Sequence, residues 1–159
     1  MLIGIISDTH DNMPVLRRAV DLLTEREVRH VVHAGDFTSP FTFRALKHLA
    51  CDFTGIYGNN DGERVLLQKL SNSRIFTQPY IIELGGRKIV IMHEHTVVDA
   101  LADSGHFDLV VYGHTHAPDI RKRGNTLIVN PGELSGWLYG KSTMAIADLA
   151  ELSAEVIEL

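Results

Sequence analysis

The stretch LIGIISDTH, residues 2–10, indicates both the fold and the chemistry of the chain. Its first five residues are apolar without alternation, which is typical of a strand that is buried on both faces of a sheet. Its last three residues, Asp8, Thr9 and His10, are polar and come where the strand must end. The stretch therefore predicts a central strand with ligand-forming side chains at its carboxyl end.

The same order of strand, polar loop and helix recurs along the first half of the chain. Further strands are predicted over residues 30–33 and 52–57, and helices are predicted over 14–27, 39–49 and 63–70. Pro14 suits the first turn of the first helix because a proline there sacrifices no helical hydrogen bond. Repetition of this unit is the signature of a mainly parallel sheet.

The second half is richer in strands. Gly85 and Gly86 form a hairpin signal between two strands over residues 80–84 and 87–92. A short helix over 97–104 is followed by strands predicted over 109–112, around Ile120, and over 127–130, 143–149 and 154–159. No linker or repeat interrupts this pattern, so residues 1–159 are expected to form a single domain.

Composition excludes several classes of protein. The net charge of −5 and the pI near 5.9 argue against a surface that binds nucleic acid by neutralising phosphates. The basic run Arg121–Arg123 is interpreted as a solvated hairpin turn. Cys51 is the only cysteine, so no intrachain disulfide is possible. There is no signal peptide and no apolar stretch of the ~18 residues that a membrane span needs, so we expect a cytoplasmic protein.

Five predicted strands stop at polar clusters. The carboxyl ends of parallel strands lie along one edge of a sheet, so these clusters are expected to meet in space. Imidazole and carboxylate ligands together suit manganese, iron, nickel or zinc. Side chains two positions apart in an extended chain point the same way, so the pairs can face one ion. The clusters are Asp8 with His10, Asp36, Asn59 with Asn60 and Asp61, His93 with His95, and His114 with His116.

As an ordered set, these motifs resemble those of the calcineurin-like metallophosphoesterases. The segments that carry the resemblance are Asp8-Thr9-His10, Gly35-Asp36, Gly58-Asn59-Asn60-Asp61, His93 and Gly113-His114-Thr115-His116. Their spacing, and the later Asn130-Pro131-Gly132-Glu133, look like those of the small YfcE-type phosphodiesterases. The resemblance extends from residue 2 to about residue 149.

This resemblance implies an α/β fold, a four-layer αββα sandwich of two mixed sheets flanked by helices. It implies two divalent metal ions that activate a hydroxide for hydrolysis of phosphodiester bonds. Manganese is the expected metal, with nickel, iron or zinc as alternatives. By resemblance, Asp36 bridges both ions, and Asn60 and Asp61 serve catalysis. The first ion would be held by Asp8, His10, Asp36 and His116, and the second by Asp36, Asn59, His93 and His114.

Two positions depart from the usual family pattern. The broader family has a histidine in place of Asn60, and that imidazole assists the leaving group. An amide cannot transfer a proton near pH 7, so Asn60 favours diesters or activated substrates over ordinary monoesters. The second departure is Glu94, where glycine usually follows the ligand corresponding to His93. Glu94 is interpreted as a solvated surface group or, alternatively, as a carboxylate at the rim of the metal site.

Several other residues near these motifs have more than one interpretation. His95 is expected to support a ligand or contact substrate, and His33 to pack in the core or support the metal ligands. Asn12 is expected either to touch the substrate phosphate or to cap the helix that begins near Pro14. Trp137 and Tyr139 are expected to wall the site, to pack in the core, or to form a subunit contact in a homodimer or larger homo-oligomer.

Four functions are consistent with this sequence to different degrees. The favoured one is a phosphodiesterase that acts on a small phosphodiester. A protein-binding scaffold of the same fold, like the retromer scaffold subunit, is disfavoured because all seven ligand positions hold competent side chains. A phosphomonoesterase is disfavoured by Asn60. A nuclease is disfavoured by the acidic balance, which leaves little room for a positively charged groove.

Overall fold

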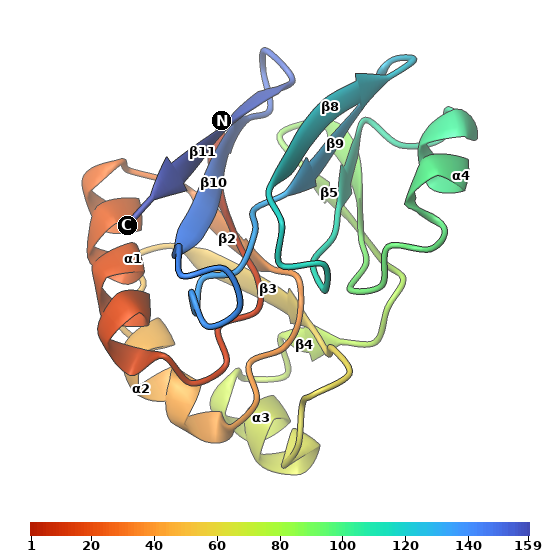
Figure 1. The fold of residues 1–159 in the computed structure, drawn as a ribbon. Coiled ribbons are helices and arrows are strands. Elements are labelled where there is room, and N and C mark those ends of the chain that lie inside the picture. The colour runs from red at the N-terminus through yellow and green to blue at the C-terminus, as the bar shows by residue number, and fades with distance from the viewer.

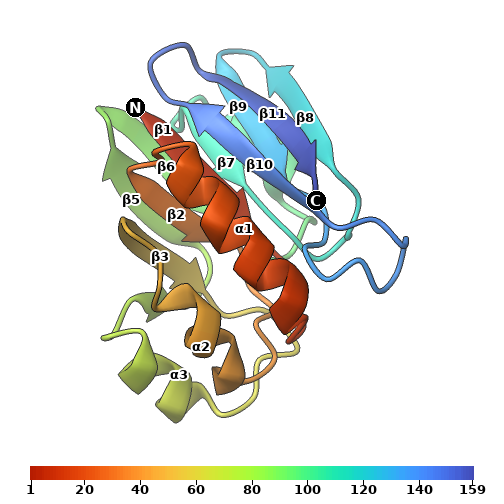
Figure 2. The same cartoon turned by 90° about the vertical axis from the view of Figure 1, so that its left-hand side faces the viewer.

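The structure is a computed structural model that describes all of residues 1–159. It contains two mixed sheets (Figures 1 and 2). The strands of the first sheet lie in the order β11-β10-β1-β2-β3-β4 and those of the second in the order β5-β6-β7-β9-β8. The strands are β1 (Leu2–Ile6), β2 (His30–His33), β3 (Asp52–Ile56), β4 (Ile75–Phe76), β5 (Tyr80–Leu84), β6 (Arg87–Ile91), β7 (Leu109–Val111), β8 (Asp119–Arg123), β9 (Thr126–Asn130), β10 (Thr143–Asp148) and β11 (Ser153–Glu158).

Helices cover the outer face of each sheet. Figure 2 shows α1 running across the first sheet, and Figure 1 shows α4 on the far side of the second sheet. Connections through helices create the parallel pairs β1–β2, β2–β3, β3–β4 and β6–β7. The parallel pair β7–β9 is connected through β8, which pairs antiparallel with β9. The helices are α1 (Met13–Glu25), the 3-10 turn η1 (Pro40–Thr42), α2 (Phe43–Leu46), α3 (Arg64–Leu70) and α4 (Val98–Asp103).

Three apolar clusters separate four layers. In β1, Ile6 faces the cluster under α1 and α2, whereas Ile3 and Ile5 face the cluster between the sheets. A third cluster joins α4 to the second sheet through Val98 and Val110. Because successive side chains of a strand point to opposite faces, the unbroken apolar run of β1 fills two cores at once. The predicted αββα sandwich is confirmed.

The structure corrects two local predictions. Residues Arg121–Arg123 lie in β8 rather than in a turn, and Arg121 and Arg123 form ion pairs with Asp99 of α4. The second helix, expected over residues 39–49, divides into η1 and α2 and ends at Leu46. Beyond it, the chain continues to residue 49 in tighter turns with hydrogen bonds to the third preceding residue. No helix combines the length and apolar content that crossing a membrane requires.

Candidate metal centre

The polar loops after five strands meet at one edge of the sandwich. The two sheets are joined there by hydrogen bonds between loops that are distant in sequence. The amide of Asp8 donates to the carbonyl of Gly35 at 3.0 Å, and the amide of His114 donates to Oδ2 of Asp8 at 3.1 Å. The ring Nδ1 of His93 lies 2.8 Å from the carbonyl of Ala34. The predicted convergence of the strand ends is therefore present in the structure.

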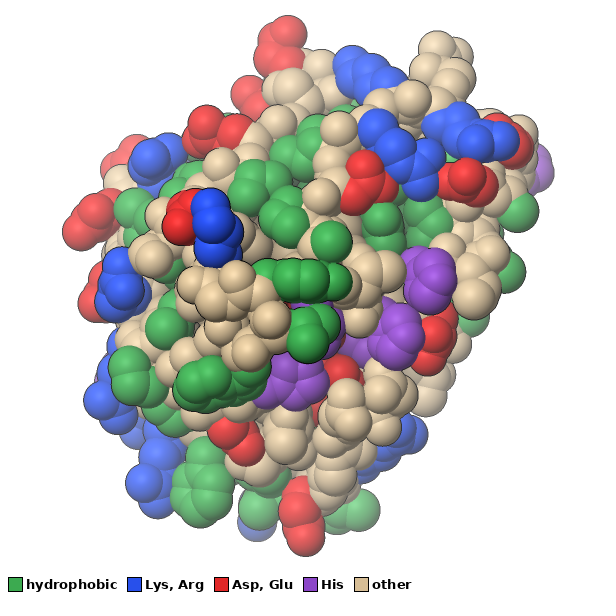
Figure 3. All heavy atoms as spheres, in the orientation of Figure 1, with side chains coloured by type: hydrophobic (Ala, Val, Ile, Leu, Met, Phe, Trp, Pro, Cys, Tyr) green, Lys and Arg blue, Asp and Glu red, His purple; other side chains and the backbone are tan.

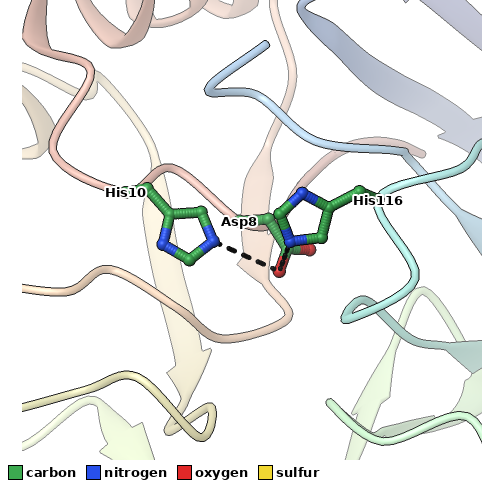
Figure 4. A group of neighbouring side chains, drawn as sticks. All are labelled: Asp8, His10 and His116. Carbon is green, nitrogen blue, oxygen red and sulfur yellow. Dashed lines mark ion pairs between the residues drawn. The ribbon is translucent and has the colours of Figure 1, made fainter. Parts of the chain in front are cut away.

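The first half of the centre consists of Asp8, His10 and His116. Figure 4 shows both imidazoles pointing at the same carboxylate oxygen. Oδ1 of Asp8 lies 3.9 Å from Nε2 of His10 and 3.4 Å from Nε2 of His116. Oδ1 of Asp8 and Nε2 of His10 are buried and have no hydrogen-bond partner. Unpartnered buried donors and acceptors are costly, and a cation between these two atoms would satisfy both.

Asp36 connects this half to a second one. Its Oδ2 lies 3.6 Å from Nε2 of His10 and 3.4 Å from Nε2 of His93. Oδ1 of Asn59 lies 2.8 Å from the same Nε2 of His93 and 3.0 Å from Nδ1 of His114. One carboxylate oxygen is thus shared between two groups of nitrogen and oxygen ligands. These contacts link all seven predicted ligands, whose chemistry fits divalent metal ions. Two groups close enough for one ion are Asp8 with His10 and His116, and Asp8 with Asp36 and His93, whereas His114 groups with Glu94 and His95.

Hydrogen bonds on the far side of the rings decide which nitrogens are available. His93 offers Nε2 to the centre because its Nδ1 faces a carbonyl, which requires a proton on Nδ1. His10 likewise contacts Oγ1 of Thr38 through Nδ1 at 3.1 Å and turns Nε2 inward. Such contacts orient ligand histidines and fix their tautomers.

The two buried aspartates differ in their electrostatics. Burial raises the pKa of the Asp8 carboxyl by more than the neighbouring Ser7 hydroxyl and histidines lower it. Burial also opposes ionisation of Asp36, but hydrogen bonding and charge from His93, with hydrogen bonds from Asn60, hold its pKa well below the usual range. Asp36 is therefore anionic across the neutral range, as a bridging ligand must be.

The backbone of the centre is unusual. Five of the candidate ligands have a left-handed backbone conformation, with φ between 38° and 67°. Residues other than glycine rarely adopt this conformation, and those that do are enriched in Asp, Asn and His and concentrate at functional sites. Gly58 approaches the Asp36 carboxylate so closely that any side chain there would overlap with it. The five ligands are Asp8, His10, Asp36, His114 and His116.

Asp61 has a different position from the one expected of a catalytic group. Its buried carboxylate accepts hydrogen bonds from the amides of Asp36 at 3.1 Å, Thr38 at 2.8 Å and Gly58 at 2.7 Å. It joins the loops after β2 and β3 and turns away from the ligand atoms. Asp61 is therefore a positioning residue, because three backbone donors occupy its oxygens.

Asn60 does lie at the centre. Its backbone amide donates to Oδ1 of Asp36 at 2.8 Å, and its side-chain Nδ2 donates to Oδ2 of the same carboxylate at 2.7 Å. The residue is exposed on its outer side. An amide donor therefore contacts the Asp36 carboxylate at the position where the family usually has an imidazole.

Two glutamates stand behind the ligand histidines. Glu133 is buried, and its Oε2 lies 3.0 Å from Nδ1 of His116. The amides of Leu138 and Tyr139 also donate to Glu133. Sequence reasoning missed this role, although Glu133 belongs to the Asn-Pro-Gly-Glu motif. Glu94 lies at the rim, with Oε2 3.6 Å from Nε2 of His114 and a side chain that is 39% exposed.

The remaining candidates are distributed as follows. His33 is buried, contacts Oγ1 of Thr9 at 3.1 Å and supports the loop of Asp8 rather than facing the centre. His95 is exposed and stacks on His114. Asn12 is the residue before α1, but its side chain donates to the carbonyl of Ser135 and makes no capping bond. Trp137 and Tyr139 are exposed, so core packing is wrong for both.

Comparisons with known proteins agree with this geometry. Residues 1–152 match the calcineurin-like phosphoesterase superfamily domain. The chain is 37% identical over 154 residues to phosphodiesterase MJ0936 of Methanocaldococcus jannaschii, with 93% of each chain covered. It is 25% identical to phosphodiesterase YfcE of Escherichia coli K12, with 81% of this chain and 77% of YfcE covered.

Solved structures show the same fold. A structure described as a novel archaeal phosphodiesterase superposes with a TM-score of 0.93 at 36% identity and complete coverage of both chains. Vps29 of Entamoeba histolytica, in complex with zinc, has a TM-score of 0.73 at 21% identity, with 100% of this chain and 98% of that chain covered. The match over nearly the whole chain, together with the converged ligand set, shows that the chain belongs to the calcineurin-like phosphoesterase superfamily.

Proposed function

We propose that the protein is a metal-dependent phosphodiesterase that hydrolyses small phosphodiesters. The observation that carries this proposal is the shared oxygen of Asp36, which lies within 3.6 Å of ring nitrogens from both halves of the centre. A shared carboxylate is the arrangement that holds two cations at a short, fixed separation. The relatives named as phosphodiesterases support the same reaction class.

Two divalent ions fit the donor set, with manganese the expected metal and nickel, iron or zinc as alternatives. Bound ions of this kind lower the pKa of water and stabilise charge on the oxygens of an in-line displacement at phosphorus. The first would be held by Asp8, His10, Asp36 and His116, and the second by Asp36, Asn59, His93 and His114.

The chain's own residues supply orientation and selectivity. Glu133 and the carbonyl of Ala34 hold the rings of His116 and His93 so that Nε2 faces inward. The side-chain amide of Asn60 donates to the Asp36 carboxylate and has no proton to transfer to a leaving group. A phosphodiester with a good leaving group needs no proton there, whereas an alkyl monoester does. The arrangement therefore favours activated diesters.

A protein-binding scaffold of the same fold is the alternative function. A scaffold that binds metal would use the same ligands, so the metal centre alone does not separate the two functions. The relatives named as phosphodiesterases, one of them 37% identical, favour the enzyme. The single-domain organisation, cytoplasmic location and homo-oligomeric state expected from the sequence remain predictions.

The test is a metal screen. Metal-free protein is loaded separately with manganese, nickel, iron, zinc and magnesium and assayed against p-nitrophenyl diesters and the matching monoester. We expect activity with at least one transition metal and a higher rate on the diester. Absence of turnover with every metal, or a preference for the monoester, would contradict the proposed function.

A further inference from the structure

Three large apolar side chains are exposed in succession after β9. Trp137 is 66% exposed, Leu138 is 63% exposed and Tyr139 is 59% exposed. Isolated exposed apolar residues need no explanation, but a contiguous group that includes two aromatic rings marks a contact surface. We call these three residues the 137–139 wall.

The backbone that carries the wall is fixed. The buried carboxylate of Glu133 accepts hydrogen bonds from the amides of Leu138 at 2.9 Å and Tyr139 at 2.7 Å. The turn is closed by a hydrogen bond from the amide of Gly140 to the carbonyl of Gly136 at 3.1 Å. The wall is thus a preorganised surface, in which exposed rings are held by a buried anchor.

The wall adjoins the metal centre. The indole Nε1 of Trp137 donates to the backbone carbonyl of His10 at 3.3 Å. The anchor Glu133 is also the carboxylate that lies 3.0 Å from Nδ1 of His116. Figure 3 shows hydrophobic side chains directly beside the group of histidines near the middle of this face. A molecule whose phosphate occupies the centre would therefore reach the wall with its organic part.

We propose that the 137–139 wall binds the organic substituent of the phosphodiester substrate, and that this substituent is a planar aromatic group of the nucleobase type. This inference rests on the proposed function and specifies its substrate class. Indole and phenol rings stack on planar groups, and such stacking tolerates different bases because every base has a π-face.

Charge favours a small substrate over a membrane or a polymer. The basic side chain nearest to the wall in sequence is Lys141, and it forms an ion pair with Glu158 at 3.1 Å. The carboxylate of Glu94 lies at the opposite rim of the centre, beside His114. Binding of anionic lipid or of a long nucleic acid requires a basic surround, and the pairing of Lys141 with Glu158 and the carboxylate of Glu94 argue against one.

The test compares two diesters with the same leaving group. Methyl p-nitrophenyl phosphate and thymidine 5′-(p-nitrophenyl phosphate) both release p-nitrophenolate, so they differ only in the retained substituent. For the metal-loaded enzyme we expect Trp137→Ala to lower the ratio of kcat/KM for the nucleoside diester over the methyl diester about tenfold. Because a ratio is measured, effects that slow both diesters equally cancel.

Two variants serve as controls. Trp137→Phe keeps a stacking ring but cannot donate to His10, and it should keep most of the wild-type ratio. Phe41→Ala removes an aromatic ring that is 58% exposed in η1, outside the wall, and should leave both rates unchanged. If Trp137→Phe loses as much of the ratio as Trp137→Ala, the indole acts through the hydrogen bond to His10, and the proposed stacking surface is refuted.

Fluorescence gives a readout that is independent of turnover. Trp137 is the only tryptophan of the chain, so its emission reports the wall alone. Thymidine 5′-monophosphate should quench this emission in a saturable manner, whereas inorganic phosphate should not. Equal effects of the two ligands would overturn the inference. So would an emission shift on phosphatidylcholine vesicles, or a dimer that Trp137→Ala dissociates. If the wild-type protein hydrolyses neither diester, the proposed function fails. The quenching experiment then still shows whether the 137–139 wall binds a nucleotide.

Discussion

The two halves of the candidate metal centre use similar ligands but are supported differently. In the first half, His116 is backed by Glu133, which is buried and accepts further bonds from backbone amides. In the second half, His114 faces Glu94, which is 3.6 Å away and substantially exposed, and the ligand Asn59 is exposed as well. The support of His116 is therefore buried, whereas the support of His114 is exposed to solvent.

This difference predicts which of the two positions has the higher affinity for metal. A buried carboxylate held by several donors keeps its histidine in one orientation, whereas an exposed carboxylate is screened by solvent and loses side-chain entropy when it pairs. We expect the first ion to bind more tightly than the second. The second, more labile ion would then set the metal concentration at which activity appears.

The largest expected effect comes from the residue that both halves share. Asp36→Ala should empty both ion positions and reduce phosphodiesterase activity to background, because its Oδ2 faces both halves. Elemental analysis after dialysis measures the ion content. As a control, Asp52→Ala removes an exposed carboxylate paired with Arg74 and should retain both ions. Retention of two ions by Asp36→Ala would rule out the bridging assignment.

Single-half variants test the comparison directly. His116→Ala should weaken the first ion, and His93→Ala should weaken the second while leaving one tightly bound ion. Metal titration by calorimetry of the metal-free variants separates the two cases. Loss of both ions in His93→Ala would contradict the predicted difference in affinity. Wild-type turnover of either variant at limiting metal would show that the replaced residue is not a ligand.

The supporting glutamates should differ in their effects. Outer carboxylates of this kind typically contribute about 10- to 100-fold to metal affinity or activity. The loss of metal affinity in Glu133→Gln should lie toward the upper end of that range, because Glu133 is buried and also accepts a hydrogen bond from the amide of Leu138. The loss of metal affinity in Glu94→Gln should lie at or below the lower end of the same range. Equal losses of metal affinity in the two variants would mean that burial of the supporting carboxylate is unimportant.

Asn60→His should produce the smallest change, and a gain rather than a loss. An imidazole there can protonate a leaving group, so hydrolysis of monoesters should rise, most for the poorest leaving group. The gain should be about tenfold, short of the roughly 10²–10⁴-fold that general acid catalysis contributes, because nothing nearby orients the new ring. Rates plotted against leaving-group pKa measure the effect. Parallel plots for variant and wild type would show that Asn60 does not limit protonation.

The sequence was informative about the ligands because each follows a strand. The apolar runs before Asp8, Asp36 and His93 indicated strands, and parallel strands bring their ends to one edge. The pairing of Glu133 with His116 depends on the path of the chain after Pro131, which no local pattern reveals. The same limit applies to Asp61, since a carboxylate in a Gly-Asn-Asn-Asp loop does not show whether it faces backbone amides or the metal centre. β4, with two residues, is too short to give a periodic signal.

The left-handed backbone at the ligands has a consequence for mutagenesis. At Asp8, Asp36, His114 and His116, φ lies between 52° and 67°. Alanine in this conformation carries a strain of about 1–3 kcal/mol, whereas glycine adopts it freely. The customary ranking of the two residues, with glycine the more damaging replacement, is therefore inverted at these four positions. Because the native aspartate and histidine residues already carry this strain, alanine removes the ligand with little change in strain, whereas glycine removes the ligand and releases the strain as well.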